Sequence, residues 1–152
     1  MKKRFSHTLP VTSAKSRAGR EIGPEDALKA LFEAFALPKE YTPHLEGASI
    51  DRSVPGVIKR ELDFGNLKVR DSVSLPSGDS LIQEIEAASA WPASRLFVEA
   101  LKAPATGTVF FRFTYLDDGR EWEEGVPTEL RKEAYRQKDR DITEFVKKSL
   151  AD

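Results

Sequence analysis

Two oppositely charged residues, Arg60 and Asp71, interrupt an apolar pattern in the stretch VIKRELDFGNLKVRDSVSL, residues 57–75. Apolar residues recur there with a period of two on both sides of Gly65-Asn66, which predicts two strands joined by a tight turn. Glycine and asparagine favour such a turn because both tolerate positive φ. A two-residue loop fixes the register, so we expect Arg60 directly opposite Asp71 on the inner face of the hairpin.

The pair formed by Arg60 and Asp71 has two interpretations. A guanidinium in a cavity wall can orient a carboxylate, enolate or phenolate of a bound ligand, because its planar fork matches such groups. Alternatively, the pair only ties two strands together as a buried ion pair. In both cases the loss of one partner leaves a buried charge, at a cost of about 3 to 5 kcal/mol.

Three further side chains are of types suited to proton transfer or polar recognition. His7 lies on the apolar side of the first predicted strand, where it is either an acid–base group or a hydrogen-bonded core histidine. Lys138 interrupts the apolar stripe of the last predicted helix. A desolvated lysine there acts as a base or a Schiff-base nucleophile, whereas a snorkelling lysine extends its ammonium to the rim. Tyr135 either offers its hydroxyl to the same space or caps the core.

Aromatic residues mark one face of the strand predicted for residues 108–116, where Phe111, Phe113 and Tyr115 recur with a period of two. As part of a packed core they need no further role. Beside a cavity, the same side chains contact a ligand.

The strand predicted for residues 80–87 carries one inward polar residue, Gln83. We prefer this register because the opposite one stacks Glu84 and Glu86 beside Asp71, and like charges on neighbouring strands repel. Gln83 therefore joins the candidate ligand-binding residues.

The composition limits the function classes. At 152 residues the chain is long enough for one domain with a sizeable core, so we expect a single domain over residues 1–152. Its 24 basic and 25 acidic residues are nearly balanced, which argues against a dedicated nucleic-acid binder. No apolar run approaches the ~18 residues of a membrane span, and we expect a cytoplasmic protein.

The residues also give no reason to expect a cofactor or a metal. The absence of cysteine excludes disulfides, thiolate metal ligands and cysteine nucleophiles. Two histidines, His7 and His44, without cysteine disfavour a structural zinc site. The glycines are isolated, so neither a phosphate-binding loop nor a dinucleotide fingerprint is present.

Periodicity and turn residues predict two helices and a series of strands. The first helix lies in GPEDALKALFEAFAL and ends before Pro38, and the last covers residues 127–150. Besides the hairpin, strands are expected at residues 4–11, 48–54, 80–87, 95–101 and 108–116. In the last hairpin we expect Leu101 to pair with Thr108. The stripe of the last helix consists of Leu130, Ala134, Tyr135, Ile142, Phe145, Val146 and Leu150.

These elements predict an α+β fold in which a curved antiparallel sheet wraps around one long C-terminal helix. A sheet of this shape leaves a space between itself and the helix. That space is a natural pocket for a ligand.

Four segments carry a resemblance to a known family: FSHTLPV, IGPEDALKALFEAF, RELDFGNLKVRDSVSL and AYRQKDRDITEFV. With the order of elements, they resemble the helix-grip folds of the START and Bet v 1-like (SRPBCC) superfamily. The chain is most similar to its acetylaranotin-cluster-protein-like branch of mostly uncharacterised bacterial and fungal proteins. The resemblance implies a cavity for lipids, hormones, polyketides or other apolar molecules, in some members with cyclase or dehydratase activity. None of the four segments is a catalytic signature, and function inferred from fold is an analogy.

Three functions follow from these observations. The first, which we favour, is non-catalytic binding of a small hydrophobic or aromatic molecule. The second is a cyclase, dehydratase or isomerase, in which His7 or Lys138 moves a proton and Arg60 stabilises an oxyanion. The third is a protein-interaction module that uses the basic segment 12–20 and the acidic segment 117–124, with a homodimer as a variant. The candidate ligand-binding residues are His7, Arg60, Asp71, Gln83, Phe111, Phe113, Tyr135 and Lys138.

Overall fold

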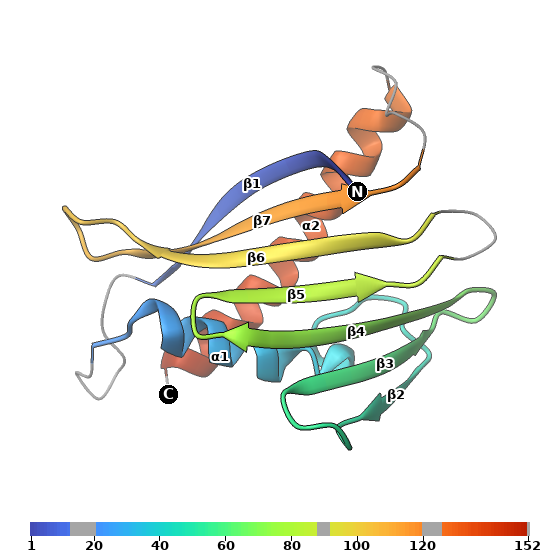
Figure 1. Cartoon of the computed structure of the whole chain (residues 1–152), viewed down its shortest axis with the longest axis horizontal. Coiled ribbons are helices and arrows are strands. Elements are labelled where there is room, and N and C mark those ends of the chain that lie inside the picture. The colour runs from blue at the N-terminus through green and yellow to red at the C-terminus, as the bar shows by residue number, and fades with distance from the viewer. Residues whose placement is uncertain (13–20, 88–91, 120–125, 152) are drawn as a thin grey trace.

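The computed structural model describes residues 1–12, 21–87, 92–119 and 126–151 of the chain. Seven strands form one antiparallel sheet in the order β1-β7-β6-β5-β4-β3-β2. The strands are β1 (Lys2–Thr12), β2 (Gly47–Asp51), β3 (Val57–Asp63), β4 (Lys68–Ser77), β5 (Ser80–Ile85), β6 (Ser94–Lys102) and β7 (Val109–Asp117). The helices are α1 (Pro24–Ala34), the short 3-10 helix η1 (Pro38–Glu40) and α2 (Val126–Ala151). Figure 1 shows α1 and α2 behind the sheet, with α2 crossing the strands.

The α1 helix begins where the sequence predicts. Pro24 occupies its first turn, and the backbone N–H of Gly23 donates a hydrogen bond to Asp26 Oδ2 over 3.0 Å. Leu28 and Leu31 are fully buried against the sheet and α2. The helix thus contributes one apolar side, and Pro24 and Asp26 stabilise its first turn.

The hairpin of β3 and β4 has the predicted register. Arg60 pairs with Asp71, and the backbone N–H of Phe64 donates to the carbonyl of Leu67 across the turn, over 2.8 Å. Of the two turn residues, Gly65 alone has a positive φ, at 92°. The two charged residues therefore lie side by side because the turn holds only two residues.

The inward orientation of Gln83 is also confirmed. Leu81 and Gln83 are buried on β5, whereas Glu84 is exposed. Ile85 pairs directly with Asp71 and is half-buried. Leu81 and Gln83 thus face the helices, and Ile85 shares their side of the strand next to the charged pair.

The predicted pairing of Leu101 with Thr108 is wrong. Leu101 lies opposite Phe110, because the bend extends through Thr108, whose carbonyl accepts a hydrogen bond from Ala103 N–H over 2.8 Å. This shift equals two residues, and side chains alternate with a period of two. Phe111 and Phe113 therefore face inward as expected, and both are fully buried.

The α2 stripe is buried only in its C-terminal half. Ile142 and Val146 are buried, but Leu130 is 65% exposed and Ala134 is also exposed, which corrects the prediction for these two residues. The reason is visible in Figure 1, where the N-terminal turns of α2 project past β1 and β7. The core consequently lies between the sheet, α1 and the C-terminal half of α2.

Candidate functional site

The pair predicted from the hairpin is a buried, two-pronged ion pair. Arg60 Nε donates to Asp71 Oδ1 over 2.8 Å, and Nη2 donates to Oδ2 over 2.6 Å. Arg60 Nη1 also donates to the carbonyl of Phe35 over 3.1 Å. Burial works against the guanidinium charge, but the hydrogen bonds and charge of Asp71 outweigh it and raise the pKa of Arg60. Arg60 is therefore always charged and already neutralised by its neighbour.

Gln83 completes this cluster and leaves one atom unsatisfied. Its Nε2 donates to Asp71 Oδ2 over 2.9 Å, which fixes the orientation of the amide because a carboxylate accepts and does not donate. The Oε1 atom is buried and has no hydrogen-bond partner among the described residues. A buried acceptor without a donor is unfavourable, so this atom marks a place where a donor would be stabilising.

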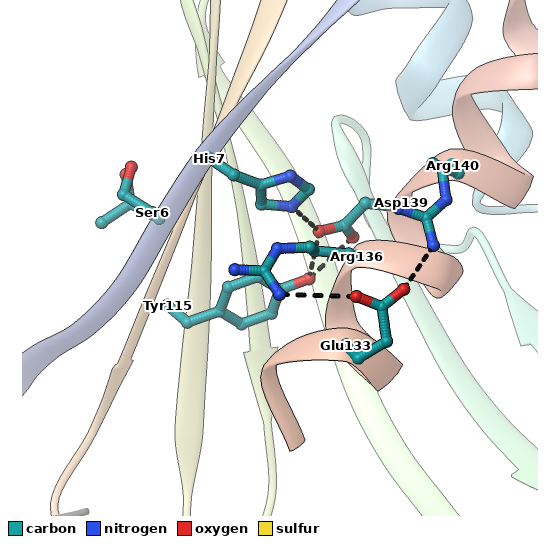
Figure 2. Close-up of polar contacts among 8 residues, drawn as sticks. Ser6, His7, Tyr115, Glu133, Arg136, Asp139 and Arg140 are labelled. Atoms are coloured by element: carbon teal, nitrogen blue, oxygen red, sulfur yellow. Dashed lines mark hydrogen bonds and ion pairs between the residues drawn. The ribbon is translucent and has the colours of Figure 1, made fainter. Parts of the chain in front are cut away.

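A second buried cluster joins α2 to the edge of the sheet. His7 Nε2 lies 2.6 Å from Asp139 Oδ2, and the Tyr115 hydroxyl donates to both Asp139 oxygens over 2.7 Å (Figure 2). Because a carboxylate only accepts, Nε2 carries the proton on His7. Burial first, and then the charge of Asp139, raise the pKa of Tyr115 well above its ordinary value. Asp139 therefore accepts hydrogen bonds from both His7 and Tyr115.

Aromatic rings surround the cluster of His7, Asp139 and Tyr115. His7 stacks on Phe5 at 5.2 Å and on Phe113 at 5.3 Å between ring centroids. Tyr115 and Tyr135 stack nearly parallel, with centroids 4.1 Å apart. These rings form an apolar wall that runs from β1 across β7 to α2.

Lys138 lies on this wall. Its Nζ is 4.9 Å from the centroid of the Tyr115 ring and 5.3 Å from that of Tyr135. The side chain is exposed to solvent, yet dense protein around it lowers the pKa of its ammonium. The two observations count different things, solvent contact of the side chain and the protein atoms that surround its ammonium.

Arg60 and Asp71 lie close enough to Lys138 for their charges to change its pKa. The charge of Arg60 lowers the pKa of Lys138 and that of Asp71 raises it, after the larger effects of burial and Asp139. Lys138 on α2 and Arg60 on β3 therefore contribute to the same electrostatic environment between helix and sheet.

Tyr41 is a further polar group near this space. Its hydroxyl donates to the carbonyl of Ala34 over 2.8 Å, and its ring contacts Phe145 of α2 at 5.5 Å. Burial raises the pKa of Tyr41 to about 12, partly opposed by the charge of Arg60. The hydroxyl is thus neutral over the physiological range.

Two grooves open near these residues. One, of about 710 Å³, crosses β2, β3, β4 and β5; besides Arg60, Asp71 and Ile85 it is lined mainly by the outward residues of the two neighbouring cross-strand rows, among them Lys59, Glu61, Arg70, Ser72 and Glu84. The other, of about 580 Å³, lies between η1 and α2 and is lined by Tyr41 and Phe145. Among the described residues, no three potential metal-ligating side chains gather into a metal site.

The structure divides the predicted site residues into groups. Arg60, Asp71 and Gln83 form one hydrogen-bonded cluster, and Tyr135 and Lys138 share the aromatic wall. His7 contacts Asp139 instead of Arg60 or Lys138 in the described contacts. Phe111 and Phe113 are fully buried and pack in the core, so their part in ligand binding stays a prediction.

The sequence analysis missed Asp139 and Tyr41. Asp139 follows Tyr135 by four residues and precedes Ile142 by three, so helical spacing placed it on the buried stripe. A carboxylate on that stripe could have been matched with the inward His7. Tyr41 lies in the short segment after Pro38, where no periodicity indicated its orientation.

Similarity to known proteins is confined to solved structures. No protein-family model matches the chain, and no curated protein matches it. The di-domain ARO/CYC StfQ from the steffimycin biosynthetic pathway superimposes with a TM-score of 0.59 at 17% identity, over 97% of this chain and 50% of that one. A START superfamily protein from Mycobacterium smegmatis gives a TM-score of 0.61 at 10% identity, over 97% and 99% of the two chains. Ara h 8.0201 gives 0.55 at 14% identity, over 96% and 98%.

The chain has the helix-grip fold of the Bet v 1 and START proteins. The predicted α+β architecture is thereby confirmed, whereas the closer resemblance to the acetylaranotin-cluster branch stays a prediction. The chain spans about half the length of the di-domain ARO/CYC protein that it matches. No helix among the described residues is long and apolar enough to span a membrane. The cytoplasmic location stays an expectation.

Proposed function

We propose that this protein binds a small, largely apolar molecule between the inner face of the sheet and α2. The observation that carries the proposal is Lys138, which keeps solvent contact while its ammonium lies over the inward Tyr115 ring. Tyr115 itself is only 4% exposed. Lys138 is thus a solvent-exposed residue directly over a buried ring of β7, and a ligand that displaces its side chain would contact that ring.

The composition of the walls supports a ligand with an aromatic or other flat apolar part. The parallel stack of Tyr115 and Tyr135 offers extended ring surface, and Ile85 adds a half-buried apolar side chain from β5. The few polar groups nearby, including Gln83 Oε1, would orient the ligand by hydrogen bonds and would add little to its affinity. Most of the affinity would come from burial of apolar surface.

The test is a fluorescence titration with N-phenyl-1-naphthylamine, a neutral apolar probe, and two tryptophan variants. Ile85→Trp places a large ring toward the helix side of the sheet, and Glu84→Trp places the same ring on the opposite face one residue earlier. We expect the wild type and Glu84→Trp to bind one probe per chain and Ile85→Trp to bind at least about tenfold more weakly. Absence of saturable binding to the wild type, or equal binding by all three, would contradict the proposal.

An enzyme of the cyclase or dehydratase type is the second candidate. The hydrogen bond between His7 and Asp139 favours it, because a carboxylate orients a histidine for proton transfer. That mechanism needs His7 or Lys138 and Arg60 to meet at one reacting atom. His7 bonds to Asp139 and Arg60 bonds to Asp71, so the described contacts support binding more strongly.

The third hypothesis, a protein-interaction module, depends on segments that lie mostly outside the described residues. The basic segment 12–20 is described only at residue 12, and the acidic segment 117–124 only at residues 117–119. Its use as a contact element and the formation of a homodimer stay predictions. Charge-neutralising substitutions in the two segments, followed by sedimentation velocity, would test both.

A further inference from the structure

Lys138 differs from the other cations near the space between sheet and helix. Arg60 is matched by Asp71, and Arg136 by Glu133 at 3.4 Å. No carboxylate among the described residues lies within ion-pair distance of Lys138 Nζ, whose contacts are the two tyrosine rings. Among the described residues, Lys138 is therefore a cation without an ion-pair partner, although Asp139 acts on it at longer range.

The surroundings of Lys138 favour an anion from a ligand. Burial lowers the pKa of this ammonium, so the protein alone stabilises its charge less than water does. A carboxylate placed beside it would restore that stabilisation through a charge-assisted hydrogen bond. The tyrosine rings beneath it provide a surface on which the apolar part of such a ligand can stack.

A second unsatisfied group lies on the sheet. Gln83 is 5% exposed, and its Oε1 atom has no donor among the described residues, while its Nε2 is held by Asp71. The neighbouring groups on Asp71 are occupied by Arg60 and Gln83 itself. A hydroxyl or N–H donor on the ligand is the chemical partner that Oε1 lacks.

The sheet register gives the backbone spacing between Gln83 and Tyr115, the residue over whose ring Lys138 lies. Gln83 pairs with Leu96, and Leu96 pairs with Tyr115, over whose ring Lys138 lies. Two strand spacings separate Gln83 from Tyr115, which is about 10 Å. A ligand that reaches both groups is therefore of the size of two fused aromatic rings with a substituent at each end.

From this arrangement, we propose that the ligand is a hydroxylated aromatic carboxylic acid, with its carboxylate at Lys138 and its hydroxyl directed to Gln83 Oε1. This proposal rests on the proposed binding function and specifies its ligand class. It also assigns to Lys138 the anion-binding role that the sequence analysis considered as one of two interpretations for Arg60. Arg60 instead holds Asp71, and Asp71 in turn orients the Gln83 amide.

The test compares three related probes by calorimetry: 2-naphthol, 2-naphthoic acid and 6-hydroxy-2-naphthoic acid at neutral pH. We expect the hydroxy acid to bind most tightly, because only it can satisfy both groups. Lys138→Met should weaken both acids by about tenfold or more and leave 2-naphthol within about twofold of the wild type. Gln83→Leu should remove the advantage of the hydroxy acid over 2-naphthoic acid.

Lys147→Met is the matched control, since Lys147 lies nine residues further on the same helix and so on its opposite side. Its ammonium pairs with Glu144 at 3.2 Å, and its loss should change none of the three affinities. Equal affinities of the wild type for the acids and 2-naphthol, or equal losses for all probes in Lys138→Met, would overturn the ligand class alone. Failure of the wild type to bind any of these probes or N-phenyl-1-naphthylamine would overturn the proposed function.

Discussion

His7 on β1 and Asp139 on α2 are joined by a hydrogen bond of 2.6 Å, although 132 residues separate them in the chain. Asp139 is 1% exposed and also accepts the Tyr115 hydroxyl, so one carboxylate ties the long helix to both strands at one edge of the sheet (Figure 2). Asp139 lies midway along α2, C-terminal to the turns that project past the sheet (Figure 1).

Removal of the Asp139 carboxylate should destabilise the protein. We expect Asp139→Ala to lower the free energy of unfolding by about 2 to 4 kcal/mol, because two buried donors lose their acceptor. Urea denaturation followed by circular dichroism measures the change. Asp141→Ala is the control, since in the described part of the chain Asp141 accepts only from Gln137 on the exposed helix surface, and it should cost less than about 1 kcal/mol. Equal losses in the two variants would show that Asp139 has no special role.

The Arg60 pair should be costly to break on one side and cheaper to replace as a whole. Arg60→Met should lower the free energy of unfolding by about 3 to 5 kcal/mol, because it leaves Asp71 buried without its cation. The double variant Arg60→Met, Asp71→Leu should recover much of that loss, since no unpaired charge is left. A double-mutant cycle in urea gives the coupling energy of the pair.

The same hairpin supplies the control for this cycle. Arg70 and Glu61 also pair directly across β3 and β4, at 2.8 Å, but on the exposed face. Arg70→Met should therefore cost less than about 1 kcal/mol, because solvent screens the pair. If the buried and exposed pairs have equal coupling energies, burial does not determine the strength of the Arg60 pair.

Stability should fall in alkaline solution because of Tyr41. Burial raises its pKa from 10.0 to about 12 in the folded state, so between pH 10 and 12 the unfolded chain has lost a proton that the folded chain still holds. The unfolded state then binds fewer protons, and the free energy of unfolding decreases as pH rises through this window, by up to about 3 kcal/mol. Below about pH 9 this group contributes almost no pH dependence, because the tyrosine is protonated in both states.

Tyr41→Phe tests the assignment. Its free energy of unfolding, measured in urea at pH 9, 10 and 11, should fall less steeply with pH than that of the wild type. Tyr115, whose pKa is also raised, remains in the variant, so a residual slope is expected. A variant whose slope is as steep as that of the wild type would remove Tyr41 from this account.

Local sequence patterns predicted the parts of the fold that depend on neighbouring residues. Gly65-Asn66 fixed the hairpin register, and hence the contact between Arg60 and Asp71, because the loop is too short for another arrangement. The longer bend after Lys102 left the register of β6 and β7 open, and the prediction was wrong by two residues. The inward faces were still predicted correctly because an even shift does not exchange them.

The composition of the candidate site depended on distances that the sequence does not contain. The stripe of α2 correctly indicated Ile142 and Val146, but periodicity cannot tell where the sheet beneath a helix ends, so Leu130 was misplaced. The partnership of His7 with Asp139 required the packing of α2 on β1. Likewise, the sequence could not indicate that no donor among the described residues lies within hydrogen-bond distance of Gln83 Oε1.

The most direct test of ligand binding between sheet and helix is native mass spectrometry with N-phenyl-1-naphthylamine. The account predicts a complex of one probe per chain for the wild type and for Glu84→Trp, and unliganded chain for a folded Ile85→Trp variant. A wild type that binds no probe at saturating concentration would contradict the account. So would an Ile85→Trp variant that binds as much probe per chain as the wild type.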